Sequence, residues 1–168
     1  MTEFKNLSET QLSKLRDAIP LITILIAGAD GKIDQEETAW AEKVTSIRSY
    51  KSEEFLLEYY KAIGEDYSIK LESLIQTLPK HVAERNAIIS QKLADLNPIL
   101  AILPLKEAAI LYKDFVTFAK HAAKASGGFF GFFSIGPEEG KVIGLPMIQE
   151  YIYVPEEVIE EDFEDPLT

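Results

Sequence analysis

The amino-acid sequence predicts an all-α helical bundle of about six or seven helices. Hydrophobic residues make up 46% of the 168 positions, which is enough for one sizeable core. Apolar residues recur at spacings of three and four along most of the chain, and no stretch of useful length alternates as a strand would. Residues that typically begin or end helices separate these stretches, so we expect the helices to follow one another through short loops.

The first predicted helix covers residues 8–28. Ser8 is its candidate N-cap, and Gln11 stands at the capping-box position three residues later. Pro20 either kinks this helix or starts a new one. One stripe of apolar side chains at helical spacing is expected to face the core, namely Leu12, Leu15, Ile19, Ile22 and Ile26.

Three further helices are expected over residues 34–50, 52–64 and 68–79. Asp34 is the N-cap of the first of these, and glutamates follow in its first turn, where the helix dipole favours acids. The apolar face of this helix is predicted to consist of Trp40, Val44 and Ile47.

The last helices are predicted over residues 81–97, 104–126 and 137–152, and the latter two have a proline suited to their first turn. We expect one helical domain over residues 1–149. Residues 150–168 contain eight acids and no Lys or Arg, so we expect them to be an acidic, flexible tail outside the fold.

The charge and composition exclude several kinds of protein. A formal net charge of -11 argues against binding to nucleic acid and against electrostatic docking to anionic lipid. Without cysteine, neither a disulfide framework nor a thiolate metal site can form. The longest apolar run, residues 19–29, is shorter than the ~20 residues that span a bilayer, and no secretory signal is evident. We therefore expect a cytoplasmic protein without direct membrane insertion.

Residues 29–37, ADGKIDQEE, resemble the second half of a calcium-binding loop. With Gly31 at the sixth position of an EF-hand loop, Asp30, Asp34 and Glu37 fall at ligand positions. The first two ligand positions fall on residues without a carboxylate, so a full EF-hand is not expected. The alternative is that this stretch is only the turn between two helices, in which Gly31 ends one helix and Asp34 caps the next.

A second stretch, residues 123–139, resembles the first once the six residues GFFGFF are left out. This predicts a duplicated helix–loop–helix unit with internal pseudo-twofold symmetry. If the two units pair, Glu138 and Glu139 approach the acids of the first loop. Oxygen ligands alone would select a divalent cation such as calcium, magnesium or manganese. Ser126 and Gly136 stand where the first loop has acids, so the expected site is weak and asymmetric.

The six inserted residues contain four phenylalanines between glycines: Phe129, Phe130, Phe132 and Phe133. These side chains either form an exposed surface for a protein partner or fold back and cover the core. A partner surface here or on the acidic tail would make the chain a purely structural interaction module without a metal. That is the alternative function that the sequence leaves open.

The strings A-x-A-D-G-x-I-x-x-x-E and A-S-G-G-F…E-E resemble the loops of the TerB-like (tellurite-resistance TerB) superfamily. The resemblance covers residues 21–44 and 115–148. It implies an all-helical cytoplasmic bacterial domain, associated with tellurite and other chemical stress, that works with membrane-associated protein partners. It also implies metal binding through acidic loop residues, which in this sequence are Asp30, Asp34, Glu37, Glu138 and Glu139.

No motif in the sequence supports catalysis, and the TerB-like resemblance implies none. A nucleophile elbow, a phosphate-binding glycine loop and a zinc-binding HExxH helix are all missing from the sequence. His81 and His121 are forty residues apart, and no cysteine is present to complete a zinc site. We therefore expect a non-catalytic domain, with a metal-dependent hydrolase as the third hypothesis.

Overall fold

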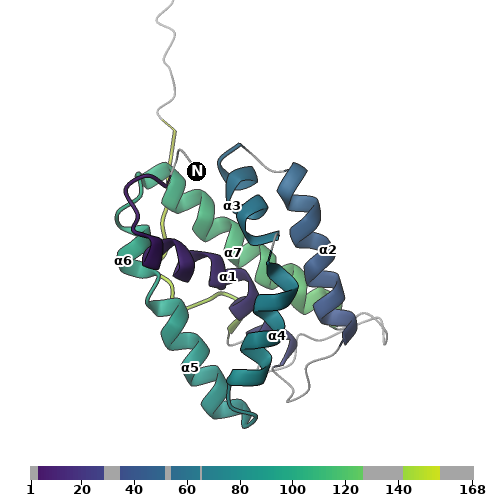
Figure 1. Ribbon diagram of the computed structural model, residues 1–168. Coiled ribbons are helices and arrows are strands. Elements are labelled where there is room, and N and C mark those ends of the chain that lie inside the picture. Colours follow the sequence, from purple (N-terminus) through teal and green to yellow (C-terminus); the bar gives the residue numbers. More distant parts are fainter. Residues whose placement is uncertain (1–3, 29–34, 52–53, 65, 127–141, 156–168) are drawn as a thin grey trace, which may run out of the picture.

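Every regular element in the described part of the chain is a helix, which confirms the predicted all-α bundle (Figure 1). The computed structural model describes residues 4–28, 35–51, 54–64, 66–126 and 142–155. Among the helices of these segments, none combines the length and the apolar character needed to cross a bilayer. The helices are α1 (Glu9–Ala27), α2 (Gln35–Lys51), α3 (Glu54–Gly64), α4 (Tyr67–Thr77), α5 (Val82–Ala94), the four-residue α6 (Asn97–Leu100) and α7 (Leu105–Ser126).

Helix α1 is the central element of the bundle. It packs against α2, α3, α4, α5 and α7, and all of its residues from Ala18 to Ala27 are buried. Every member of the predicted apolar stripe is buried as well. Pro20 lies inside one continuous helix, so the alternative that a new helix starts there is wrong. Because each large apolar side chain contributes about 1.5–3 kcal/mol when fully buried, α1 is the main source of hydrophobic stabilisation.

The two ends of α1 are held by different kinds of contact. At the start, Ser8 Oγ accepts a hydrogen bond from the Gln11 amide at 3.3 Å, and Gln11 Oε1 accepts one from the Ser8 amide at 2.8 Å. This confirms the predicted capping box. At the other end, the Gly28 amide donates to Ile24 O at 3.0 Å, and the buried guanidinium of Arg85 on α5 donates to the Gly28 carbonyl. The helix thus ends where predicted, but on a contact with a residue far away in the sequence.

The core-facing side of α2 agrees with the predicted one only in part. Val44 packs against the core as predicted, and the side chain of Trp40 lies outside the described part of the chain. Ile47 is 36% exposed, so its place in the apolar face was wrong. The side that packs inward also carries the buried Ala41 and Thr45 and the half-buried Arg48. Polar groups can face inward here because each has a partner. Thr45 Oγ1 donates to Ala41 O at 2.8 Å, and Arg48 meets an aspartate of α7.

The predicted helix over residues 137–152 is also wrong in its described part. Within residues 142–155 only Val142 is helical, and turns and then extended backbone follow. Leu145 has a positive φ of 48°, and Pro146 comes directly after it, so the backbone cannot continue as a helix at this point. Leu145 and Ile148 are buried in the core. The segment is therefore a strap that crosses the bundle rather than a further helix.

Asn97 fastens this strap to α6. Its side-chain amide donates to the Met147 carbonyl at 3.0 Å and accepts from the Gln149 amide at 2.7 Å. Beyond this point residues 150–153, which the sequence suggested would belong to the tail, lie beside α7, and Tyr151 packs against the core. Two polar contacts and the buried side chains of Ile143, Leu145 and Ile148 thus hold a segment that has almost no regular structure of its own.

Candidate functional site

The residues predicted from sequence to bind a cation or a partner lie largely outside the described part of the chain. Residues 29–34 and 127–141 are not described, and Glu37 is in the first turn of α2 without a described side chain. In the segments that are described, no group of three or more His, Cys, Asp or Glu side chains could hold a metal ion. The internal repeat, the cation site and the phenylalanine surface therefore stay predictions for Asp30, Asp34, Glu37, Glu138, Glu139, Phe129, Phe130, Phe132 and Phe133.

Arg85 places a positive charge directly before the first acidic loop. Its side chain is only 5% exposed and donates to the carbonyl of Gly28. Its Nε has no hydrogen-bond partner within the described segments. Asp30 follows Gly28 by two residues in the sequence. A cation close to the Gly28 carbonyl would be disfavoured by charge repulsion from this buried guanidinium.

The inner face of α7 carries a buried polar cluster. Arg48 of α2, Tyr60 of α3 and Asp114 of α7 meet there. Arg48 Nη1 lies 2.6 Å from Asp114 Oδ1 and donates to Tyr60 OH at 2.8 Å. Tyr60 OH donates to Asp114 Oδ2 at 2.5 Å. The guanidinium also lies over the ring of Phe118, 5.3 Å from its centroid. The cluster joins three helices at one point.

Burial dominates the titration of this inner cluster. It raises the pKa of the Asp114 carboxyl, and the charge of Arg48 and the hydrogen bond from Tyr60 oppose that effect. Burial also raises the pKa of Tyr60, and the nearby Asp114 carboxylate adds to the rise. The cluster thus holds a paired charge and a protonated phenol. Since its groups already satisfy one another, we interpret it as structural.

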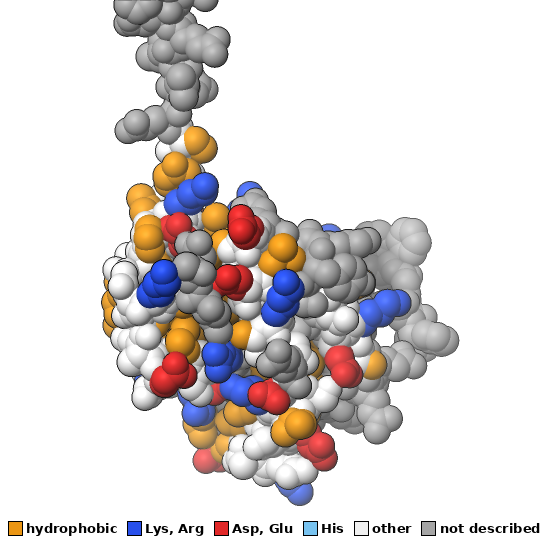
Figure 2. Space-filling view, turned by 45° about the horizontal axis from the view of Figure 1, so that its top comes forward, with side chains coloured by type: hydrophobic (Ala, Val, Ile, Leu, Met, Phe, Trp, Pro, Cys, Tyr) orange, Lys and Arg blue, Asp and Glu red, His pale blue; other side chains and the backbone are white. Residues whose placement is uncertain are grey.

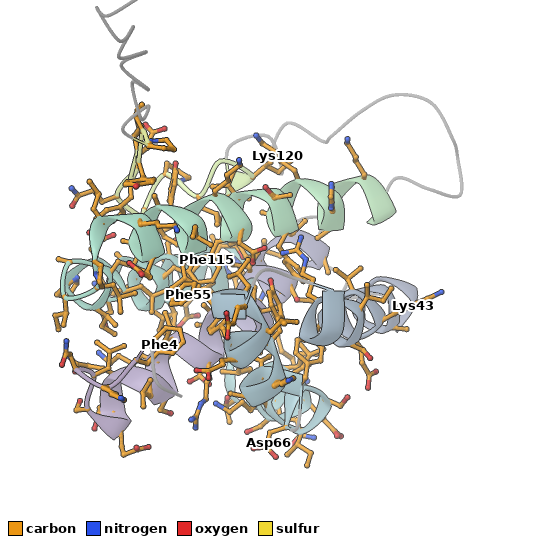
Figure 3. All side chains as sticks on the ribbon, turned by 90° about the horizontal axis from the view of Figure 1, so that it is seen from above. Phe4, Lys43, Phe55, Asp66, Phe115 and Lys120 are labelled. Carbon is orange, nitrogen blue, oxygen red and sulfur yellow. The ribbon has the colours of Figure 1, made fainter. Side chains whose placement is uncertain are left out.

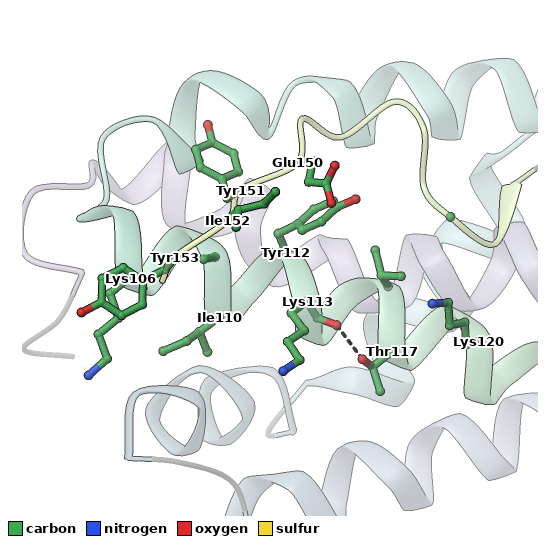
Figure 4. A pocket seen from close by; sticks show the side chains of 13 residues that line it. Lys106, Ile110, Tyr112, Lys113, Thr117, Lys120, Glu150, Tyr151, Ile152 and Tyr153 are labelled. Atoms are coloured by element: carbon green, nitrogen blue, oxygen red, sulfur yellow. Dashed lines mark hydrogen bonds between the residues drawn. The ribbon is translucent and has the colours of Figure 1, made fainter. Parts of the chain in front are cut away.

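The opposite face of α7 lines a groove that we take as the candidate site, the α7 groove. The hollow has a volume of about 660 Å³ and lies between α7 and residues 144–153 of the strap (Figure 4). Figure 3 shows the two faces of the helix: Phe115 lies on the side toward Phe55 and Phe4, whereas Lys120 lies on the other side. The groove therefore belongs to the solvent side of the bundle.

Three lysines seven residues apart line this groove: Lys106, Lys113 and Lys120. Seven residues are close to two helical turns, so these side chains share one face of α7. All three are exposed, and none forms an ion pair with another described residue. The sole acid among the residues that line the groove is Glu150. The groove thus gathers positive charge on a chain with a net charge of -11.

The rest of the groove is apolar and aromatic. Ile110, Tyr112 and Val116 are partly buried and pack against the core. Partial burial raises the pKa of Tyr112, and the Glu150 carboxylate adds to this, so the phenol stays protonated at neutral pH. On the strap side lie the aromatic rings of residues 151 and 153. A ligand of this groove therefore meets apolar surface and ammonium groups together.

Exposed apolar side chains continue from one end of the groove. Ile152 is 68% exposed and Val154 is 78% exposed. Figure 2 shows hydrophobic side chains gathered around the point where the described chain ends, with Lys or Arg side chains close by. A concentration of exposed apolar groups beside free charges is typical of an interaction surface.

The described lining of the groove offers few groups for nucleophilic chemistry. Its lining contains no serine, cysteine or histidine. The one aliphatic hydroxyl, that of Thr117, donates to the Lys113 carbonyl at 2.7 Å. No nucleophile is paired with a base, which is the minimum for nucleophilic catalysis.

Sequence reasoning missed this site because its two walls come from separate segments. A signal for one wall was present: the lysines at 106, 113 and 120 repeat every seven residues on a predicted helix of an acidic chain. The second wall exists only because the strap leaves the helical path at Leu145 and returns beside α7. Compared with known proteins, the chain matches no family model, no curated protein and no solved structure.

Proposed function

We propose that this chain is a non-catalytic protein-interaction domain that binds an acidic segment of a partner protein in the α7 groove. One observation carries this proposal. Lys106, Lys113 and Lys120 line an apolar groove without an ion-pair partner among the described residues. Exposed lysines attract an acidic segment and set its register, and the apolar floor adds the favourable free energy of buried surface.

The TerB-like resemblance belongs to the same proposal. It rests on the two loop sequences and supports a cytoplasmic bacterial stress-response domain that works through protein partners. A groove for a partner is compatible with this role.

A second candidate function is weak binding of a divalent cation by the acidic loops. The pattern ADGKIDQEE supports it, and the buried charge of Arg85 beside Gly28 weighs against it. Calorimetric titration with calcium, magnesium and manganese tests it directly. Saturable binding that disappears in D30A/D34A/E37A would support a cation site, whereas no binding to the wild-type chain would remove it.

The binding proposal is tested with a fluorescent synthetic peptide of glutamate and leucine residues and with a control peptide in which glutamine replaces glutamate. We expect the variant K106E/K113E/K120E to bind the acidic peptide at least about tenfold more weakly than the wild type, because three attractive charges become repulsive. Binding of the glutamine peptide should be weak to both chains.

A matched variant separates local charge from net charge. In K5E/K43E/K80E three exposed lysines outside the groove are reversed, so the net charge changes by the same amount. This variant should bind the acidic peptide as the wild type does. Equal weakening in both variants would show a general charge effect and contradict a site in the α7 groove.

A further inference from the structure

We propose that the acidic segment at residues 156–168 of the same chain occupies the α7 groove when no partner is bound, and that a partner must displace it. This inference rests on the proposed function, because it assigns the segment and the partner to one site. It makes the groove a regulated surface whose affinity for a partner depends on the charge of the segment.

The charges of the segment and the groove are complementary. Residues 156–168 contain seven Asp and Glu residues and no Lys or Arg. The lysines at 106, 113 and 120 lack ion-pair partners within the described chain. Elsewhere on α7 the acid at position 114 is already bound to Arg48 on the inner face. The three lysines on the outer face of α7 therefore attract the carboxylates of residues 156–168.

The apolar residues of the segment also match the groove. Val158, Ile159, Phe163 and Leu167 are interspersed among its acids. The groove offers partly buried aliphatic side chains and the rings of Tyr112, Tyr151 and Tyr153. A purely acidic peptide would gain only screened charge attraction at such a surface. The mixed composition adds hydrophobic contact, which salt does not screen.

The segment starts at the groove and is long enough to follow it. The described chain ends at Pro155, two residues after Tyr153, which lines the groove together with Lys106 (Figure 4). Lys120 lies fourteen positions after Lys106, which corresponds to about 21 Å of helix. Thirteen extended residues reach up to about 43 Å. The segment can therefore turn back at the Lys106 end and run along all three lysines.

Covalent attachment makes a weak contact sufficient. A short flexible connection gives an effective concentration in the millimolar range. The same segment of a second copy would have to reach this concentration against the mutual repulsion of two chains with a net charge of -11. We therefore assign the contact to one chain rather than to a dimer.

The test uses full-length variants. In E160Q/E161Q/D162N/E164Q four acids of the segment are neutralised. In the control, E9Q/D66N/E72Q/E84Q, four exposed acids on the helices or at their ends are neutralised instead. We expect the first variant to bind the acidic peptide about tenfold more tightly than the wild type, because the intramolecular competitor is weakened. The control should bind it as the wild type does.

Amide NMR shifts without any peptide provide the second readout. Neutralising the segment should shift the amides of Lys106, Lys113 and Lys120, to the same extent at low and high protein concentration. Unchanged shifts together with unchanged peptide affinity would overturn the inference and leave the proposed function intact. Shifts that grow with protein concentration would assign the contact to a second copy and overturn it too.

The two proposals fail in different ways. If no variant binds the acidic peptide but the lysine amides shift when the segment is neutralised, the segment occupies the groove and the partner proposal is wrong. If the lysine variant loses peptide binding but the segment variant behaves as the wild type, the partner proposal stands and the occupancy by residues 156–168 is wrong.

Discussion

On the inner face of α7, Asp114 is buried and bound to Arg48 and Tyr60, whereas on the outer face Lys106 and Lys113 are exposed and unpaired among the described residues. Both faces belong to one helix, but within the described segments the charged groups of the inner face are paired and those of the outer face are not. The inner charges have fixed partners from α2 and α3. The outer charges lie beside an apolar groove that a ligand can enter.

This difference separates what maintains the fold from what is available for binding. A buried charge that loses its partner is strongly unfavourable, so inner charges are bound within the chain. An exposed lysine is solvated and contributes little to stability, so it is free to meet a ligand. We therefore expect substitutions on the inner face to change the free energy of unfolding and substitutions on the outer face to change binding.

The largest expected effect comes from breaking the inner cluster. R48L leaves the buried Asp114 carboxylate without its counter-charge and should lower the free energy of unfolding by about 3–5 kcal/mol. Denaturation in urea, followed by circular dichroism, measures it. A loss of less than about 1 kcal/mol would mean that the inner cluster behaves like an exposed ion pair, and the contrast between the faces would disappear.

A smaller effect is expected at Gly28, beside the second buried guanidinium. A Cβ at this position would lie 2.6 Å from Arg85 Nη2 and 2.8 Å from Ile24 O. Because one of these atoms is backbone and the other is buried, G28A should cost about 1–3 kcal/mol. Gly64 offers a matched control, since a Cβ there meets nothing within 4 Å. G64A that destabilises as much as G28A would contradict the role given to the close approach of Arg85.

Alkaline pH should weaken the fold through its buried tyrosines. Burial raises the pKa values of Tyr59, Tyr60 and Tyr67 above the usual value near 10. Above about pH 10 these phenols ionise in the unfolded chain but stay protonated in the folded one. The unfolded state then binds fewer protons, so stability is present below pH 10 and is lost as pH rises toward the folded pKa values.

Each of these tyrosines should contribute about 1.4 kcal/mol of lost stability per pH unit in that range. Urea unfolding at several pH values between about 9 and about 11 measures the slope. Y67F should reduce it by the contribution of one tyrosine, whereas Y112F, in the outer groove, should change it less. An identical slope in Y67F and the wild type would show that Tyr67 ionises in the folded state as it does in the unfolded chain.

The smallest effect on stability is expected on the outer face. K106E/K113E/K120E should change the free energy of unfolding by less than about 1 kcal/mol, because these side chains are exposed. Reversal near the start of α7 is favoured by the helix dipole, and reversal near its end is disfavoured, so the two effects partly cancel. Urea unfolding of this variant and of R48L, measured in parallel, compares the free energies of unfolding for the two faces of α7.

Much of the fold follows from local patterns. The capping box at Ser8 and the stripe from Leu12 to Ile26 place α1 and its buried side, because both depend on residues only a few positions apart. The inward side of α2 does not follow, since Arg48 faces the core only because Asp114 meets it from a distant helix. Apolar spacing alone assigned Ile47 to that side.

The groove depends still more on distant contacts. Gly144 and Pro146 are local signals that a helix stops near Leu145. Nothing local indicates that the chain then turns back beside α7, or that Asn97 binds backbone groups about fifty residues away. The lysine repeat of α7 is visible in the sequence, but its apolar neighbours become a groove only when the strap lies beside them. A sequence pattern can place charges on a helix face but cannot supply the opposite wall.

The most direct test of the contrast between the inner and outer faces of α7 uses K106E/K113E/K120E. Peptide affinity and the free energy of unfolding are measured on the same preparation of this variant. We predict that affinity for the acidic peptide falls at least about tenfold while stability stays within about 1 kcal/mol of the wild type. Unchanged affinity in the folded variant would contradict the α7 groove as the binding site. A loss of stability comparable to that of R48L would contradict the claim that the outer charges are free of a structural role.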